Sequence, residues 1–246
     1  MKEPDGAEAD ERTSIPYSGG ELELFAEANI WRAYWQGQVT GFIGKRVLEV
    51  GAGLGSVVRS LPALAVERWV ALEPDPAMAD RLLSLSRSGI IPPFCEPRLG
   101  TTASLGPAEQ FDTVLYVDVL EHIEDDRAEL MRATRHLARN GTLIVLAPAH
   151  QWLYTPFDAA IGHFRRYELA GLLDLGPPDL SVARARYLDT VGLLASLANR
   201  LLLKQSAPTP AQIRVWDQVM VRVSRWLDPA VRFRLGKSVL VVWRNA

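Results

Sequence analysis

Short apolar runs alternate with amphipathic stretches along most of the chain. Each run is five to seven residues long and mostly apolar, which is typical of a buried strand. The runs lie at residues 46–50, 69–73, 111–117, 142–147, 182–188 and 238–243. A further strand is expected within 91–99, where Pro92, Pro93 and Pro97 interrupt the pattern.

Between the strands, apolar residues recur every three or four positions, which is the spacing of an amphipathic helix. The predicted helices cover 21–40, 56–61, 125–138, 168–173, 190–204 and 211–227, and Pro74-Asp75-Pro76 begins another. Asn140-Gly141 is the expected end signal of the helix over 125–138. This alternation of strands and helices predicts an α/β fold, with a doubly wound, mostly parallel sheet and helices on both faces.

We interpret residues 1–246 as one domain, because the chain has neither an internal repeat nor a long linker. Residues 1–16 are expected to be a disordered leader, 20–44 an N-terminal helical lid and 190–236 a helical insertion before the last strand. Residues 1–27 contain eight acids and two bases, whereas residues 190–246 contain nine bases and two acids. Either the two ends neutralise each other, or the basic end faces an anionic substrate or a membrane surface.

Composition excludes several classes of protein. The 246 residues are 48% hydrophobic and 23% charged, so a sizeable core is expected. The net charge is −2, so the basic excess of a nucleic-acid-binding protein is absent. The single cysteine, Cys95, excludes an intrachain disulfide, and the four histidines lie too far apart in sequence to form a helical metal pair. We therefore expect no metal and no nucleic-acid partner. With no secretion signal and no apolar run of membrane-spanning length, the expected location is cytoplasmic, with peripheral membrane contact left open.

A glycine-rich turn follows the first strand. Gly51-Ala52-Gly53-Leu54-Gly55 lies between a strand and a helix, where glycines let the backbone approach an anionic ligand. The second strand ends in Glu73, 22 residues after Gly51, where a carboxylate can accept hydrogen bonds from both ribose hydroxyls of an adenosine. Together these features predict a nucleotide-like cofactor, either a dinucleotide or S-adenosylmethionine.

Three further features resemble class I S-adenosylmethionine-dependent methyltransferases. Glu49 lies two residues before Gly51, the glycine spacing is G-x-G-x-G, and Phe111-Asp112-Thr113-Val114 precedes Leu120-Glu121-His122. The resemblance implies a seven-stranded sheet of order 3-2-1-4-5-7-6, whose last strand is antiparallel, and S-adenosyl-L-methionine as cofactor. The cofactor-binding residues it implies are Glu49, Gly51, Ala52, Gly53, Gly55, Glu73, Pro74, Thr101, Thr102, Val117 and Asp118. Thr101 and Thr102 stand where such enzymes usually carry an acid for the adenine.

The segment after the fifth strand resembles a bacterial subgroup of these enzymes, through Pro148-Ala149-His150, Phe157-Asp158 and Gly162-His163-Phe164-Arg165-Arg166-Tyr167. Members of that subgroup modify glycans, lipids or secondary metabolites. An imidazole is basic enough to accept a proton at neutral pH, so His150 and His163 are the candidate catalytic bases. The candidate substrate-binding residues are Tyr34, His150, Asp158, His163, Arg165, Arg166 and Tyr167. In the alternative interpretation, the 162–167 loop only anchors itself to the sheet.

The sequence therefore predicts a methyltransferase acting on oxygen or nitrogen of a small-molecule acceptor, such as a secondary metabolite, a sugar or a lipid-linked intermediate. Two alternatives remain: a nicotinamide-dependent oxidoreductase on a similar sheet, and a non-catalytic scaffold that keeps the cofactor fold.

Overall fold

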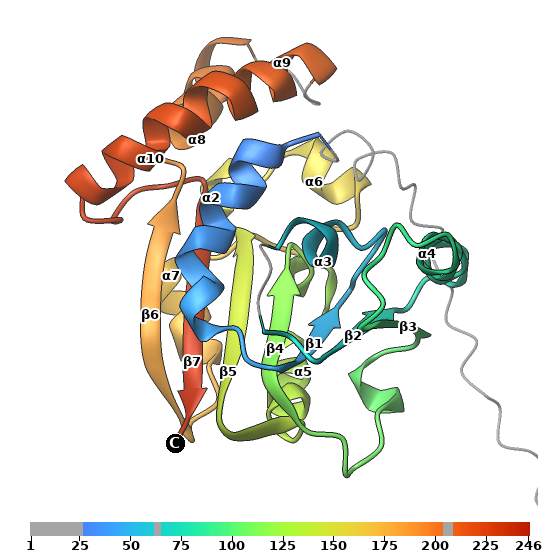
Figure 1. The fold of residues 1–246 in the computed structure, drawn as a ribbon. Coiled ribbons are helices and arrows are strands. Elements are labelled where there is room, and N and C mark those ends of the chain that lie inside the picture. Colours follow the sequence, from blue (N-terminus) through green and yellow to red (C-terminus); the bar gives the residue numbers. More distant parts are fainter. Residues whose placement is uncertain (1–26, 62–64, 204–208) are drawn as a thin grey trace, which may run out of the picture.

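The computed structural model describes residues 27–61, 65–203 and 209–246. The predicted leader over 1–16 and the first part of the predicted helix over 21–40 lie outside these residues. The described part contains a seven-stranded sheet of order β3-β2-β1-β4-β5-β7-β6, as the resemblance implies (Figure 1). The strands are β1 (Arg46–Val50), β2 (Arg68–Glu73), β3 (Cys95–Leu99), β4 (Phe111–Val117), β5 (Leu137–Pro148), β6 (Leu180–Leu188) and β7 (Ser238–Asn245). β7 is antiparallel to both of its neighbours.

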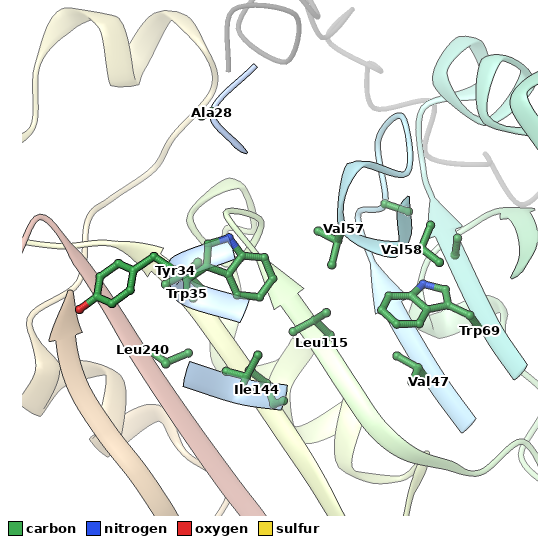
Figure 2. Packing of buried hydrophobic residues seen from close by; sticks show 14 of the residues in the cluster. Ala28, Tyr34, Trp35, Val47, Val57, Val58, Trp69, Leu115, Ile144 and Leu240 are labelled. Atoms are coloured by element: carbon green, nitrogen blue, oxygen red, sulfur yellow. The ribbon is translucent and has the colours of Figure 1, made fainter. Parts of the chain in front are cut away.

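Helices cover both faces of the sheet. Trp35 of α2 and Trp69 of β2 lie in one core cluster with side chains of α3, α4 and the C-terminal helices (Figure 2). Leu130 of α5 and Leu172 of α7 lie in the cluster on the other face. The helices are α2 (Asn29–Val39), α3 (Ser56–Ser60), α4 (Pro76–Arg87), α5 (Asp126–Thr134), α6 (Pro156–Ala160), α7 (Leu169–Leu175), α8 (Thr190–Ala198), α9 (Pro210–Val215) and α10 (Val221–Ala230). The sheet therefore has an apolar layer on each face, between its strands and the covering helices, as expected for a doubly wound fold.

The prediction for residues 125–141 is wrong at one boundary. α5 ends at Thr134, and β5 begins at Leu137 instead of 142. Asn140 takes a positive φ of 61°, and the pairing between β4 and β5 shifts at this point. Asn-Gly thus lies in an irregularity within a strand and does not end the helix, because β5 advances five residues, from Leu137 to Thr142, while β4 advances two. The same dipeptide suits both structures, so local sequence alone did not distinguish them.

The segment between β6 and β7 lies across the carboxyl ends of the parallel strands (Figure 1). Each of its two predicted helical stretches includes a π-helical segment, Asn199–Leu203 after α8 and Trp216–Met220 between α9 and α10. Two buried carboxylates fasten these helices. Asp228 accepts hydrogen bonds from the backbone of Asp189 and Thr190 and from the Tyr34 hydroxyl, which links α10 to β6 and α2.

Asp189 lies just after β6 and accepts hydrogen bonds from the Ser224 hydroxyl and the Trp216 indole. The helices are therefore fixed to the carboxyl edge by buried polar contacts as well as by apolar packing. This position supports the interpretation of α2 and residues 190–236 as a lid, which stays a proposal.

Replacement of Trp243 should test whether β7 is a central element of the core. The indole is 1% exposed and lies so close to Gly176 that a Cβ there would be 2.5 Å from its Nε1, whereas Trp226 on α10 is 85% exposed. We expect Trp243→Ala to lower the free energy of unfolding by about 3–5 kcal/mol, because it leaves a cavity in the sheet core. Chemical denaturation measures the effect. Trp226→Ala is the matched control, and equal stability of the two variants would contradict a buried central β7.

Candidate active site

The glycine turn after β1 adopts a conformation that side chains disfavour. Gly51, Gly53 and Gly55 have φ values of 70°, 54° and 70°. A Cβ on Gly51 would lie 2.6 Å from Cγ2 of Val119, and one on Gly55 would lie 2.5 Å from Cδ1 of Ile91. The turn therefore needs glycine for conformation and for space. Its backbone is tied to β2, since the N–H of Ala52 donates to the carbonyl of Leu72 over 2.9 Å.

Glu73 connects this turn to the end of β2. Its carboxylate accepts hydrogen bonds from the backbone N–H of Gly53 at 2.7 Å and of Asp75 at 3.0 Å. Burial raises the pKa of the Glu73 carboxyl, and these two hydrogen bonds oppose the rise. Pro74, beside it, is exposed. The acid thus lies at the end of β2 and fixes the glycine turn, and its contact with a ribose stays a prediction.

Glu49 lies deeper in the sheet, on the same face as Trp69. The Trp69 indole donates to its Oε2 over 2.8 Å. Burial raises the pKa of the Glu49 carboxyl to about 8, an effect that the charge of Glu73 strengthens and the indole hydrogen bond opposes. Of the two acids, Glu49 is the less exposed at 2%. Its role in cofactor binding stays a prediction.

The predicted adenine-side residues differ in the structure. Thr102 is buried, and its hydroxyl donates to the Glu129 carboxylate of α5. Tyr116 donates to the same carboxylate over 2.7 Å. Thr101, in contrast, is exposed. Thr102 therefore joins the core beneath the site, which leaves Thr101 as the better placed of the two for a cofactor contact.

Backbone strain marks the end of β4. Asp118 has a φ of 52°, which is rare for a residue with a side chain, and its N–H donates to the carbonyl of Leu146. Burial raises the pKa of the Asp118 carboxyl to about 6, and the charges of His163, Lys237 and Arg166 oppose the rise. The residue as a whole still has exposed surface. Val117, just before it, is half-buried. Strained backbone of this kind is concentrated at functional sites.

Asp158 organises the loop after β5. Its carboxylate accepts two hydrogen bonds from the Arg166 guanidinium, at 2.9 and 3.0 Å, and two from Thr155, at 2.8 and 2.7 Å. Nδ1 of His163 lies 3.1 Å from the same carboxylate. Although burial opposes it, this set of donors holds the pKa of the Asp158 carboxyl well below its ordinary value. The structure thus brings three predicted substrate residues together: Asp158, His163 and Arg166.

Arg165 and Tyr167 point to a different acid. Both contact Asp126 at the start of α5, with Nη1 of Arg165 at 2.6 Å and the Tyr167 hydroxyl at 2.9 Å from its Oδ2. Arg165 also donates to the carbonyl of Glu124. These contacts favour the anchoring interpretation for the two residues.

Tyr34 donates to Asp228 over 2.6 Å within the interface of α2 and α10. Its hydroxyl therefore joins α2 to α10, which is a structural role.

His150 lies apart from the Asp158 network. Its Nδ1 is 3.0 Å from Oε2 of Glu168, and its ring stacks on Tyr187 at 4.9 Å between centroids. Its Nε2 is buried and has no hydrogen-bond partner among the described residues. The backbone of His150 is strained, with a φ of 67° directly after β5. His150 therefore has a buried ring nitrogen without a hydrogen-bond partner, whereas Nε2 of His163 lies 3.9 Å from Glu121.

Sequence reasoning missed Lys237, which precedes β7. Burial lowers the pKa of its ammonium, and the nearby acids Asp189 and Asp118 oppose this change. The ammonium lies 4.8 Å from the centre of a Trp216 ring. No local motif marks this lysine, because its neighbours in space come from other segments of the chain.

The comparisons with known proteins agree with this geometry. Residues 48–143 match the family model described as "Methyltransferase domain". These residues are therefore similar to a methyltransferase domain. The glycine turn and Glu73 fit S-adenosylmethionine as the cofactor. The fold is that of class I methyltransferases.

A curated relative, the ubiquinone biosynthesis O-methyltransferase of Bradyrhizobium diazoefficiens, is 29% identical over 110 residues. The match covers 44% of this chain and 42% of that protein, so the chain matches less than half the length of this relative.

Two solved structures share the fold. Coclaurine N-methyltransferase bound to N-methylheliamine and S-adenosylhomocysteine has a TM-score of 0.58 at 12% identity, over 88% of this chain and 72% of that one. The N-methyltransferase NodS of Bradyrhizobium japonicum WM9, also with S-adenosylhomocysteine, has a TM-score of 0.54 at 14% identity, over 95% and 93%.

Replacement of Glu73 should weaken cofactor binding. Removing a charged acceptor of hydrogen bonds costs roughly 1.5–3 kcal/mol, so we expect Glu73→Ala to reduce the affinity for S-adenosylhomocysteine about tenfold to a hundredfold. Titration calorimetry measures the affinity. Glu67→Ala is the matched control, because Glu67 is an exposed acid just before β2 that pairs with Lys45. Unchanged affinity in Glu73→Ala would refute the assignment.

Proposed function

We propose that this methyltransferase transfers the methyl group of S-adenosylmethionine to an oxygen or nitrogen atom of a small-molecule acceptor. The acceptor site in this proposal is formed by His150, the loop over Asp158–Tyr167 whose last residue accepts a backbone hydrogen bond from it, the end of β4 and the helices over 190–236. The single observation that carries the proposal is the convergence of Asp118, Asp158, His163 and Arg166 at the carboxyl edge of the sheet, beside the glycine turn. In doubly wound sheets, ligands bind at this edge. Cytoplasmic location and membership of the subgroup with the G-H-[FY]-R-R-Y loop are part of this proposal.

S-adenosylmethionine supplies the electrophilic methyl group, and the residues of the chain align the acceptor and remove its proton. For the proton we favour His150 over His163. The contact between Glu168 and Nδ1 of His150 can fix the ring and leave Nε2 as the acceptor, which is how an orienting carboxylate works in other general-base sites. His163 instead lies between two carboxylates, those of Asp158 and Glu121.

Loss of His150 should reduce the rate of transfer and leave cofactor binding intact. The assay supplies S-adenosylmethionine labelled in its methyl group, with lipid and aqueous fractions of a cell extract as acceptors. We expect a labelled product with the native protein and a rate lower by a factor of roughly 100 to 10,000 with His150→Gln. Affinity for S-adenosylhomocysteine and a melting curve are the controls. A native protein that binds cofactor but labels nothing would support the scaffold alternative, and full activity of His150→Gln would exclude His150 as the base.

An exposed apolar stripe favours a lipid-linked acceptor among the small molecules considered. Val215, Val219, Val223 and Trp226 follow one another at helical spacing along the outer side of α9 to α10, and all four are exposed. Exposed arginines accompany them at positions 214, 222 and 225. A helix with an apolar outer stripe and flanking arginines suits the surface of an anionic membrane. Among the described residues no helix is long and apolar enough to cross a bilayer, so the contact we propose is peripheral.

The stripe predicts binding to vesicles that contain an anionic phospholipid. Trp226→Ser combined with Val223→Ser should abolish most co-sedimentation with phosphatidylglycerol vesicles, because it removes two exposed apolar side chains from the contact. Higher salt should weaken the binding of the native protein, and neutral phosphatidylcholine vesicles should bind it poorly. Trp152→Ser, at an exposed tryptophan outside the stripe, is the matched control. Dimerisation through this face without vesicle binding would overturn the proposal.

A further inference from the structure

Three potential metal ligands meet just beyond β4. Glu121 and His122 belong to the short 3-10 helix Leu120–His122, and His163 comes from the loop after α6. One side-chain ligand atom of each residue lies within 4.8 Å of those of the other two. The histidines are 41 positions apart in sequence, which is why no metal pair was expected from their spacing.

Glu121 lacks the partners that a buried acid needs. Its side chain is 0% exposed, and neither carboxylate oxygen has a hydrogen-bond partner among the described residues. An unpaired buried carboxylate is costly, so a native structure that keeps one has a reason such as an ion or a functional role.

The two imidazoles are oriented as metal-binding histidines usually are. Nδ1 of His163 contacts Asp158 at 3.1 Å, while its Nε2 faces Glu121 at 3.9 Å. The ring of His122 hydrogen-bonds to the backbone of Gly162 and meets the His163 ring edge to face, with 4.5 Å between centroids. In metal sites the second ring nitrogen of a histidine normally pairs with a carboxylate or a carbonyl, which fixes the ring.

We propose that Glu121, His122 and His163 bind a divalent transition-metal ion, with Asp158 as the carboxylate that positions His163. Two imidazoles and one carboxylate form a ligand set that suits Zn²⁺ or Fe²⁺ and leaves coordination positions open for water or an acceptor oxygen. Metal–ligand bonds of about 2.0–2.2 Å require ligand atoms about 3–3.5 Å apart, so side-chain movements of roughly 1 Å complete the site. Ion binding does not depend on the acceptor or on the methyl transfer proposed above.

The test uses the full-length protein without a histidine tag, first stripped with a chelator. Calorimetric titration with Zn²⁺ should give one ion per chain, and Co²⁺ should give visible d–d absorption bands of a site with nitrogen and oxygen ligands. Glu121→Gln and His163→Ala should each weaken binding by at least about tenfold, and Asp158→Asn by about tenfold to a hundredfold. His150→Ala is the matched control, because it removes a histidine that also faces a carboxylate but lies outside the cluster.

Melting curves and S-adenosylhomocysteine titrations show whether each variant is folded. The proposal is overturned if the folded native protein binds neither Zn²⁺ nor Co²⁺, or if Glu121→Gln binds them as well as the native protein does. In that case His163 hydrogen-bonds to Asp158 and packs against Glu121 without a metal ion. The readout is ion binding and not turnover. Absence of ion binding would therefore leave the proposed methyl transfer standing, and absence of methyl transfer would leave the proposed ion site standing.

Discussion

Buried carboxylates at and near the carboxyl edge of the sheet constrain the rest of the structure. Removing a carboxylate from water is costly unless donors surround it. The donors of Glu73 and Asp228 include other elements, and those of Asp158 come from its own loop, so satisfying the acids also fixes the loops around the site. The acids concerned are Glu49, Glu73, Asp126, Asp158, Asp189 and Asp228. Glu121 is the exception, since neither of its oxygens has a partner in the described part of the chain.

These contacts divide the edge into two parts. On the β1–β2 side, Glu73 holds the glycine turn through the N–H of Gly53, so the backbone that faces the cofactor is set before any ligand arrives. On the β4–β5 side, Asp158 fixes His163 and Arg166 within one loop. Preorganisation on both sides reduces the ordering that binding would otherwise require. Methyl transfer depends on alignment more than on side-chain chemistry, so this rigidity matters for the rate.

Much of the cofactor side could be predicted from the sequence, because its signals are local. The glycine turn is one short segment, Glu73 ends a strand, and the apolar run at 238–243 indicates a central strand. The acceptor side depends on contacts between distant residues. Arg165 reaches Asp126 of α5 across 39 positions of sequence, and Glu121 meets His163 across 42 positions. Neither spacing carries a periodic signal, so the partners become visible only when the fold brings them together.

The lid helices show how one segment can carry two apolar faces. Toward the sheet, Ile213, Trp216 and Val221 are buried in the core on the α2 side. Away from it, Val215, Val219 and Trp226 are exposed on the same run of helix. A surface helix of a globular protein needs only the inner stripe, so the outer one contributes little to folding. Because Asp189 and Asp228 fix these helices to the end of β6, a membrane bound at the outer face would lie at a constant position relative to the acceptor edge. The lipid-linked acceptor that we propose would then approach along the rim of the same helices, so that one element would serve both substrate access and membrane contact.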